Sequence, residues 1–236
     1  RPDVKNRLGL DYDTLSAINP RVVLASISGF GQDGPYQKRP GFDQIAQGMG
    51  GLMSITGFEG QGPVRAGIAV ADSTTGLFSA IGILTALIER EQSGRGQWVQ
   101  ANLLSSMIAL CDFQAARYLI DGVVPPQAGN DHPVTTPMGA FQSADGYFNL
   151  GVGNTQQFRT LCDLIDRPDL RDQPEYQTNA GRLKDRALLA EVGARHVLGV
   201  AKALNYRHGY FDQTGELWSP EGHLLASTHQ LVYFKD

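Results

Sequence analysis

The chain has 236 residues, with 20 Lys and Arg against 24 Asp and Glu and a formal net charge of −4. This length can bury a sizeable core in one large or two small domains, and the absence of a basic block argues against nucleic-acid binding. Its 28 Gly and 12 Pro suggest a loop-rich α/β enzyme.

The N-terminal part predicts short helices around one buried strand. Residues 1–20 indicate a short polar helix or turn and then a second helix around residues 13–18. Residues 21–28, RVVLASIS, are short, apolar and β-branched, which predicts a buried parallel strand opening into glycines. These glycines do not fit GxGxxG and Pro35 follows them, so we discard a dinucleotide site. Residues 41–53 have helical spacing before they end in glycines.

Residues 70–91 predict the long helix around which the chain is organised. Leu77, Ile81, Leu84 and Ile88 recur at spacings of four, three and four, which predicts one buried helix face. Asp72 stands where this helix begins, beside free backbone N–H groups and the positive end of the helix dipole. Asp72 is therefore either an N-cap, for which Asp is a preferred residue, or a nucleophilic carboxylate held ionised at a helix start.

The remaining segments predict further helices and two hairpins. Residues 98–119 indicate a second long apolar helix, and GNDHP at residues 129–133 a loop. Residues 140–152 predict a hairpin with Asp145-Gly146 at its turn. The other expected elements are a helix over 155–165 with Phe158, Leu161, Cys162 and Ile165 on one face, a charged helix over 179–194, and strands over 209–219 and 223–235.

Cysteine use and hydropathy bear on location. Cys111 and Cys162 lie in predicted helices without a CxxC pattern, so we expect core thiols in a reducing cytoplasm rather than a disulfide or metal site. No apolar run reaches the length of about 18 residues that is needed to span a bilayer, so we do not expect this chain to be a membrane protein. Because the chain starts at Arg1, we expect its natural N-terminus to lie upstream, and the missing signal peptide is weak evidence about location.

Four stretches together resemble the family III CoA-transferases, which include formyl-CoA:oxalate and carnitine CoA-transferases. They are residues 1–47, 69–99, 129–133 and 141–154, and the resemblance covers roughly residues 1–192. It implies an α/β fold, a partial version of the family's: a remnant of a parallel-sheet nucleotide-binding domain, helices and a small α+β part, truncated at both ends. We expect a core over residues 1–135, a small α+β segment over 136–195, and a foreign-looking β-hairpin tail over 196–236.

The resemblance places the family's catalytic aspartate at Asp72, which would attack an acyl-CoA thioester to form an anhydride and then an aspartyl-CoA thioester. It maps CoA contacts onto Arg7, Leu8, Arg39, Pro40, Gly41 and Phe42. Arginine suits phosphate because its fork of donors matches the oxygens, although Arg7 taken alone is better explained as a solvated surface residue.

Four further residues are candidate neighbours of the site. Asp43 falls on an acidic active-site position of the family, with Gln47 one turn later on the same face; each also fits an ordinary helix start or polar face. Gly129 and His132 lie where relatives carry a glycine loop that covers the catalytic aspartate. With one glycine present, we expect His132 to serve as a loop hydrogen-bonding residue rather than an acid–base group.

The resemblance further implies no tightly bound cofactor or metal, a CoA thioester and a small carboxylic acid as substrates, and an interlocked homodimer if the full fold forms. The related α-methylacyl-CoA racemases have Gly-His-Asp where this chain has Gly41-Phe42-Asp43. Phe42 cannot transfer a proton, which favours a transferase over a racemase. A non-catalytic remnant of the family remains the alternative.

The tail resembles a different class of protein. Residues 215–235 look like the last hairpin of a hotdog-fold acyl-CoA thioesterase, in which Gln230 falls on a glutamine that positions water. An exposed polar strand residue explains Gln230 equally, and the tail offers no partner carboxylate, so a working thioesterase is not expected.

Overall fold

The computed structural model describes the backbone of residues 2–142, 147–196, 198–207, 210–218 and 224–233, and the side chains among these up to residue 192. The chain divides into two compact units, residues 1–129 and 130–236. The predicted three-part division is a different partition and stays a prediction.

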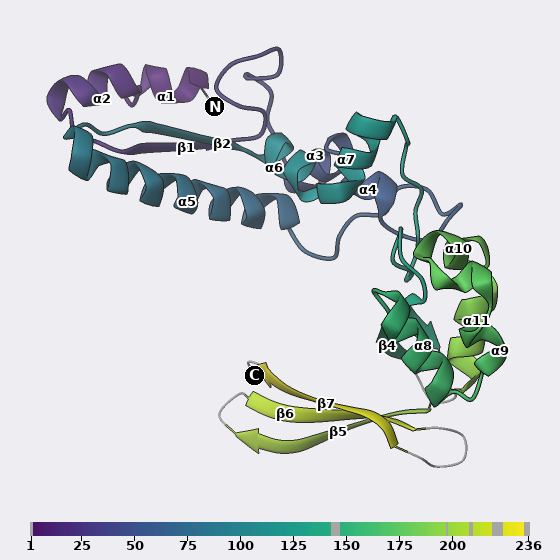
Figure 1. Ribbon diagram of the computed structural model, residues 1–236. Helices are drawn as coiled ribbons and strands as arrows, with labels where there is room; N and C mark the ends of the chain where they lie inside the picture. The colour runs from purple at the N-terminus through teal and green to yellow at the C-terminus, as the bar shows by residue number, and fades with distance from the viewer. Residues whose placement is uncertain (1, 143–146, 197, 208–209, 219–223, 234–236) are drawn as a thin grey trace. The chain divides into compact units, whose positions relative to one another are not determined.

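The first unit is built on a two-stranded parallel sheet (Figure 1). Strand β1, Leu24–Ser28, pairs with β2, Trp98–Asn102, in a register that sets Leu24 opposite Trp98 and Ser28 opposite Asn102. A parallel pair needs a long crossover, and helix α5, Val70–Ser93, lies in that crossover and packs on both strands. In Figure 1 α5 lies on one side of the strands, and helices α1, Pro2–Arg7, and α2, Tyr12–Ile18, lie on the other. The predicted α/β class and the parallel strand are confirmed. The expectation that this strand is buried is wrong, because the residues of β1 alternate between half-buried and exposed, with Ile27 52% exposed.

The expected single helix over residues 98–119 is wrong. The segment forms β2, then α6, Leu103–Leu110, and α7, Asp112–Asp121, with an angle of 82° between the two helices. Pairing with β1 holds the first five residues extended, and the Trp98 Nε1–H donates to Ser26 Oγ at 3.0 Å. The Asn102 side chain then caps α6 by accepting from the Ser105 N–H.

The buried face of α5 is not the predicted one. The apolar stripe is exposed, by 66% at Leu77, 59% at Ile81, 60% at Leu84 and 70% at Ile88. The buried face carries small residues with the same helical period, namely Ala71, Thr75, Ser79 and Ala86. Gly82 lies on it too, since a Cβ there would lie 2.6 Å from Val99 Cγ1 on β2. Small side chains let the helix backbone approach the sheet closely, so the larger aliphatic residues point away from it.

The composition of α5 corrects a second expectation. The helix has 24 residues, and an 18-residue window within it has a mean hydropathy of 1.4 with 22% of the window buried, so by length and composition this one helix among the described residues could cross a membrane. The sequence reading missed it because Ser, Thr and Gly interrupt the apolar run. The core helix of a soluble protein passes the same test, and α5 packs on a sheet.

Two short helices lie between β1 and α5. Helix α3, Asp43–Met49, lies within the predicted helical stretch 41–53, whereas α4, Leu52–Ile55, extends two residues past it. The buried Ala46 of α3 packs with Ala71 of α5 and with Leu103 and Met107 of α6. This small cluster fixes α3 against the start of α5.

The second unit begins with the predicted hairpin. Strands β3, Met138–Gln142, and β4, Tyr147–Gly151, pair antiparallel, while the expected Asp145-Gly146 turn lies outside the described residues. Helix α8, Thr155–Leu164, buries the predicted face, with Phe158 and Cys162 at 1% exposure. After α9, Pro168–Arg171, and the 3-10 helix η1, Pro174–Gln177, the expected helix over 179–194 is two helices, α10, Asn179–Lys184, and α11, Arg186–His196.

The C-terminal residues form an antiparallel sheet in the order β5-β6-β7. Strands β6, Tyr210–Trp218, and β7, Leu224–Tyr233, confirm the predicted strand pair, and β5, Leu198–Arg207, is a third strand that the sequence reading missed. Gln230 lies on β7 opposite Gln213, but its side chain and the expected turn at 220–222 lie outside the described part of the chain.

Candidate active site

Asp72 lies in the first turn of α5 but does not cap it. The helix begins at Val70, and its N-cap is Ala69, which has no side-chain capping bond. Asp72 is exposed, and within the described residues its carboxylate forms no hydrogen bond or ion pair. The N-cap interpretation of Asp72 is therefore wrong, because the N-cap lies three residues earlier, at Ala69.

The capping role at α5 belongs to Asp43. Its Oδ1 accepts the backbone N–H of Ala71 at 2.7 Å, across 28 residues of sequence. This N–H is one of the donors that a helix start leaves without an intrahelical partner. Because α3 supplies the acceptor, the neighbouring carboxylate of Asp72 is left free to face solvent.

Gln47 and Arg65 surround the same carboxylate. Gln47 Nε2 donates to Asp43 Oδ2 at 2.7 Å, and Arg65 Nη2 lies 3.8 Å from that oxygen. Gln47 is fully buried, whereas the Arg65 side chain is 45% exposed. No motif in the sequence singles out Arg65, although it is the one charged residue between Glu59 and Asp72.

The residues mapped to CoA precede α3 and approach the end of β1. A Cβ added at Gly41 would lie 2.2 Å from the Gly29 Cα, so both glycines are needed for the two backbones to cross. Arg39 is exposed, with its guanidinium carbon 4.6 Å from the Tyr36 ring centroid, and Phe42 is 67% exposed. The segment 39–42, which includes Pro40, thus presents a cation and an aromatic ring to solvent.

Arg7 and Leu8 lie at the end of α1. Both are exposed, and the Leu8 N–H donates to Val4 O and Lys5 O in the closing turn of the helix. Neither side chain joins residues 39–42 through a hydrogen bond or ion pair in the described part of the chain.

Gly129 and His132 fall in different units. Gly129, at φ +58, donates its N–H to Gly57 O at 2.9 Å and packs against the Phe58 ring. His132 Nδ1 accepts the N–H of Val134 at 3.3 Å, and His132 O accepts from Arg186 Nη1 at 2.8 Å. Both residues make local loop contacts within their own units.

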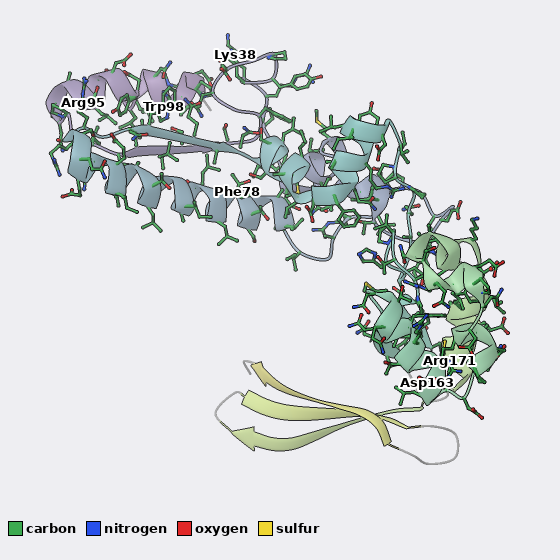
Figure 2. All side chains as sticks on the ribbon, in the orientation of Figure 1. Lys38, Phe78, Arg95, Trp98, Asp163 and Arg171 are labelled. Atoms are coloured by element: carbon green, nitrogen blue, oxygen red, sulfur yellow. The ribbon has the colours of Figure 1, made fainter. Side chains whose placement is uncertain are left out.

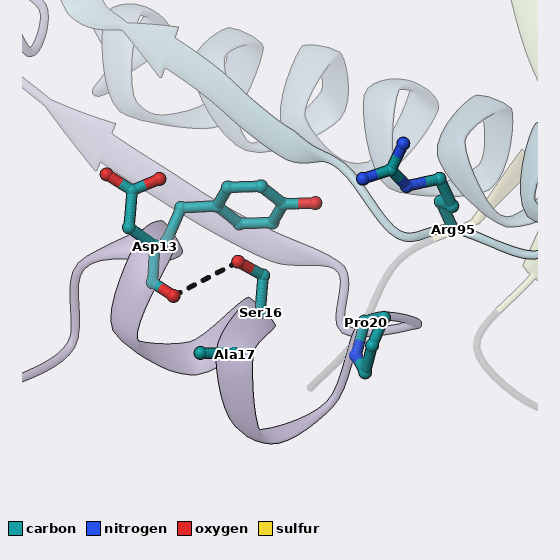
Figure 3. A pocket seen from close by; sticks show the side chains of 6 residues that line it. Asp13, Ser16, Ala17, Pro20 and Arg95 are labelled. Atoms are coloured by element: carbon teal, nitrogen blue, oxygen red, sulfur yellow. Dashed lines mark hydrogen bonds between the residues drawn. The ribbon is translucent and has the colours of Figure 1, made fainter.

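A hollow of about 340 Å³ lies elsewhere in the first unit (Figure 3). Its lining residues are Tyr12, Asp13, Ser16, Ala17, Pro20 and Arg95. Figure 2 labels Arg95 beyond the C-terminal end of α5, whereas Asp72 is in its first turn. A helix of 24 residues is about 36 Å long, so this hollow is separate from the Asp72 site.

Within the described part of the chain, neither the two cysteines nor a cluster of metal-binding side chains forms part of this site. Cys111 and Cys162 are buried free thiols, as expected, and burial raises the pKa of Cys162 to about 11. Among the residues that the structure describes, no group of three or more His, Cys, Asp or Glu side chains is arranged to hold a metal ion.

The fold and the site define an α/β protein with a free carboxylate at a helix start. The chain belongs to CoA-transferase family III, whose sequence pattern matches residues 1–201. The match extends slightly past the predicted limit near residue 192 and excludes most of the three-stranded sheet, whose resemblance to a thioesterase hairpin stays a prediction.

Named relatives and solved structures agree with this assignment. The chain is 39% identical over 191 residues to the human succinyl-CoA:glutarate CoA-transferase, covering 81% of this chain and 44% of the relative. It is 41% identical over 186 residues to the Agrobacterium fabrum succinate–glutarate CoA-transferase, covering 79% and 46%. A CAIB/BAIF family protein from Brucella suis has a TM-score of 0.66 and 39% identity, covering 82% and 51%. A hypothetical protein from Mycobacterium tuberculosis has a TM-score of 0.71 and 27% identity, covering 83% and 53%. The chain spans about half the length of these proteins.

Proposed function

We propose that the protein transfers CoA from an acyl-CoA thioester to a carboxylic acid, with Asp72 as the nucleophile. The observation that carries this proposal is the exposed carboxylate in the first turn of α5, without a partner among the described residues. A carboxylate can act as a nucleophile without a general base to remove a proton. The positive end of the α5 dipole further favours a negative charge at this place.

In each step of the proposed reaction, one bond to a carbonyl carbon forms and another bond to the same carbon breaks. Its carboxylate oxygen attacks the thioester carbonyl, the C–S bond breaks, and the CoA thiolate leaves behind a mixed anhydride. The thiolate then attacks the aspartyl carbonyl and releases the donor carboxylate, giving an aspartyl-CoA thioester. An acceptor carboxylate displaces the thiolate to form a second anhydride, and thiolate attack on the acceptor carbonyl restores the Asp72 carboxylate. Alignment of these groups is the main catalytic requirement.

The CoA moiety is proposed to contact Arg7, Leu8 and residues 39–42. Arg39 is exposed beside Phe42, which suits a ligand that carries both phosphates and an adenine ring. The tight crossing of Gly41 over Gly29 fixes this segment at the end of β1. No tightly bound cofactor is required by this scheme.

The substrates are proposed to be small dicarboxylates. The names of relatives mention succinate and glutarate, oxalate, and citramalate, which are all dicarboxylic acids. Succinyl-CoA as donor and glutarate as acceptor are therefore the first pair to test. A racemase is less well supported, because Phe42 has no group that can transfer a proton.

The proposal is tested by trapping the covalent intermediate. Incubation with succinyl-CoA and then hydroxylamine should give a hydroxamate at Asp72, located by peptide mass spectrometry, and Asp72→Asn should give none. Asp13→Asn is the matched control, since Asp13 is also exposed in the first turn of a helix, and it should label like the wild type. A wild-type chain that binds CoA in a calorimetric titration but forms no hydroxamate would contradict the proposal.

The same titration distinguishes the active transferase from the alternative, a non-catalytic remnant of the family. Such a remnant should neither bind CoA at micromolar concentration nor form the adduct. A homodimer and a cytoplasmic location remain proposals from the family resemblance. Sedimentation equilibrium of the purified chain tests the dimer, and fractionation of the source cells tests the location.

A further inference from the structure

Residues 66–71, here termed the lead-in segment, bring the chain to Asp72. They contain no regular structure until Val70, where α5 begins. The position of the Asp72 backbone therefore depends on what holds these residues in place.

Gln47 holds the lead-in segment through both ends of its amide. Its Oε1 accepts the backbone N–H of Ala66 at 2.9 Å, and its Nε2 donates to the backbone oxygen of Ile68 at 3.3 Å. The same Nε2 donates to Asp43 Oδ2 at 2.7 Å. Gln47 is fully buried, so its amide has no water with which to replace these bonds when they are lost.

Asp43 continues the chain of contacts to the residue before the nucleophile. With its Oδ2 held by Gln47, its Oδ1 accepts the N–H of Ala71 at 2.7 Å. Ala71 is itself fully buried in the cluster that joins α3, α5 and α6. Three points of the lead-in segment are thus fixed to α3, and the last of them is adjacent to Asp72.

Only a primary amide can make this set of bonds at position 47. The Ala66 N–H needs an acceptor and the Asp43 carboxylate a donor. Ile68 O takes the Gln47 donor in addition to the Val70 N–H at 2.9 Å and Arg65 Nη2 at 3.4 Å. An ionised glutamate side chain in the same place would have no donor and would face Asp43 with a like charge, and an aliphatic side chain would satisfy none of the three.

We infer that Gln47 is a positioning residue that fixes the Asp72 carboxylate through the lead-in segment and Asp43. This inference rests on the proposed function. Gln47 is fully buried, so it has no exposed surface with which to contact CoA or the acyl group. Loss of Gln47 should slow the attack step rather than weaken substrate binding. A nucleophile misplaced by about 1 Å can slow a reaction on the order of a hundredfold.

The test is the single-turnover rate of hydroxamate formation at Asp72 with succinyl-CoA. Gln47→Met keeps the length of the side chain but removes all three bonds. At saturating succinyl-CoA it should form the adduct at least about tenfold more slowly than the wild type. Its half-saturating succinyl-CoA concentration should stay within about twofold of the wild type, since binding is not the affected step.

Gln114→Met is the matched control. Gln114 is also a buried glutamine, 6% exposed, but it lies on α7 and accepts from Arg117 Nη1 at 2.9 Å. It should leave the rate of adduct formation unchanged. Rates are compared per folded molecule, with the folded fraction of each variant measured by circular dichroism, so that a purely structural loss leaves the rate constant intact.

Amide hydrogen exchange gives a second readout that needs no turnover. In Gln47→Met the amides of Ala66 and Ala71 should exchange at least about tenfold faster, while that of Met107 in the core stays protected.

An unchanged rate constant in a folded Gln47→Met overturns the inference and leaves the proposed function standing. Unchanged exchange at Ala71 overturns it as well, because the contact would then not depend on Gln47. Absence of the adduct in the wild type overturns the proposed function and this inference together.

Discussion

Truncation of Ile81 to alanine should change the free energy of unfolding far less than its place in the apolar stripe of α5 suggests. A fully buried isoleucine truncated to alanine costs about 2–5 kcal/mol. Ile81 is 59% exposed, so less than half of its surface is withheld from water.

Multiplying this cost by the buried fraction of Ile81 gives roughly 1–2 kcal/mol for Ile81→Ala. The higher helix propensity of alanine returns up to about 0.5 kcal/mol, and an open site leaves no sealed cavity. The net loss should therefore be about 1 kcal/mol or less.

Met107→Ala is the internal comparison, because Met107 of α6 is fully buried in the cluster at the start of α5. It should cost about 2–5 kcal/mol. Urea unfolding followed by circular dichroism at 222 nm measures both variants. If Ile81→Ala destabilised the protein as much as Met107→Ala, the exposed placement of the stripe would be refuted.

Two further predictions concern packing and thiol chemistry. Gly82→Ala should destabilise the protein by about 1–3 kcal/mol, because its Cβ would lie 2.6 Å from Val99 Cγ1. Gly76→Ala in the same helix meets nothing within 4 Å and should stabilise by up to about 1 kcal/mol; unfolding midpoints measure both, and equal signs would contradict the assigned face of α5. Cys162, with its pKa raised to about 11 by burial and then by the charges of neighbouring aspartates, should be labelled by iodoacetamide at pH 8 at least about a hundredfold more slowly in the native than in the urea-unfolded protein. Comparable native and unfolded labelling rates would show that this thiol is accessible.

Local sequence patterns gave a sound account of the elements that local interactions decide. Residues 21–28 predicted the parallel strand, and the helix over 155–165 buries the face that carries Phe158 and Cys162. In the helix one side meets the core, so the hydrophobic pattern and the packing agree. The same holds for the β3–β4 pair, whose alternation needs no distant partner. In the parallel strand the pattern gave the element type but not its burial, since Ile27 is 52% exposed.

Predictions from local hydrophobic spacing were wrong where contacts with a distant segment determine the backbone conformation. Residues 98–102 are apolar enough for a helix, but their parallel pairing with β1 makes them a strand. That pairing joins residues more than 70 positions apart, and no local spacing reveals it. The split at Asp185 likewise follows contacts such as the hydrogen bond that it accepts from the Tyr176 hydroxyl at 2.9 Å.

For the candidate site, the amino-acid sequence was enough to identify the family and to place Asp72 near the start of a long helix, because both depend on residue identity and local spacing. Packing in the folded chain determined which face of that helix is buried, because close approach to a sheet selects small side chains such as Ala71 and Gly82 rather than the most apolar ones. Packing also determined that Asp43 caps the helix from α3 and leaves the Asp72 carboxylate free. A hydrogen bond across 28 residues has no periodicity in the sequence, and only the folded chain brings its partners together.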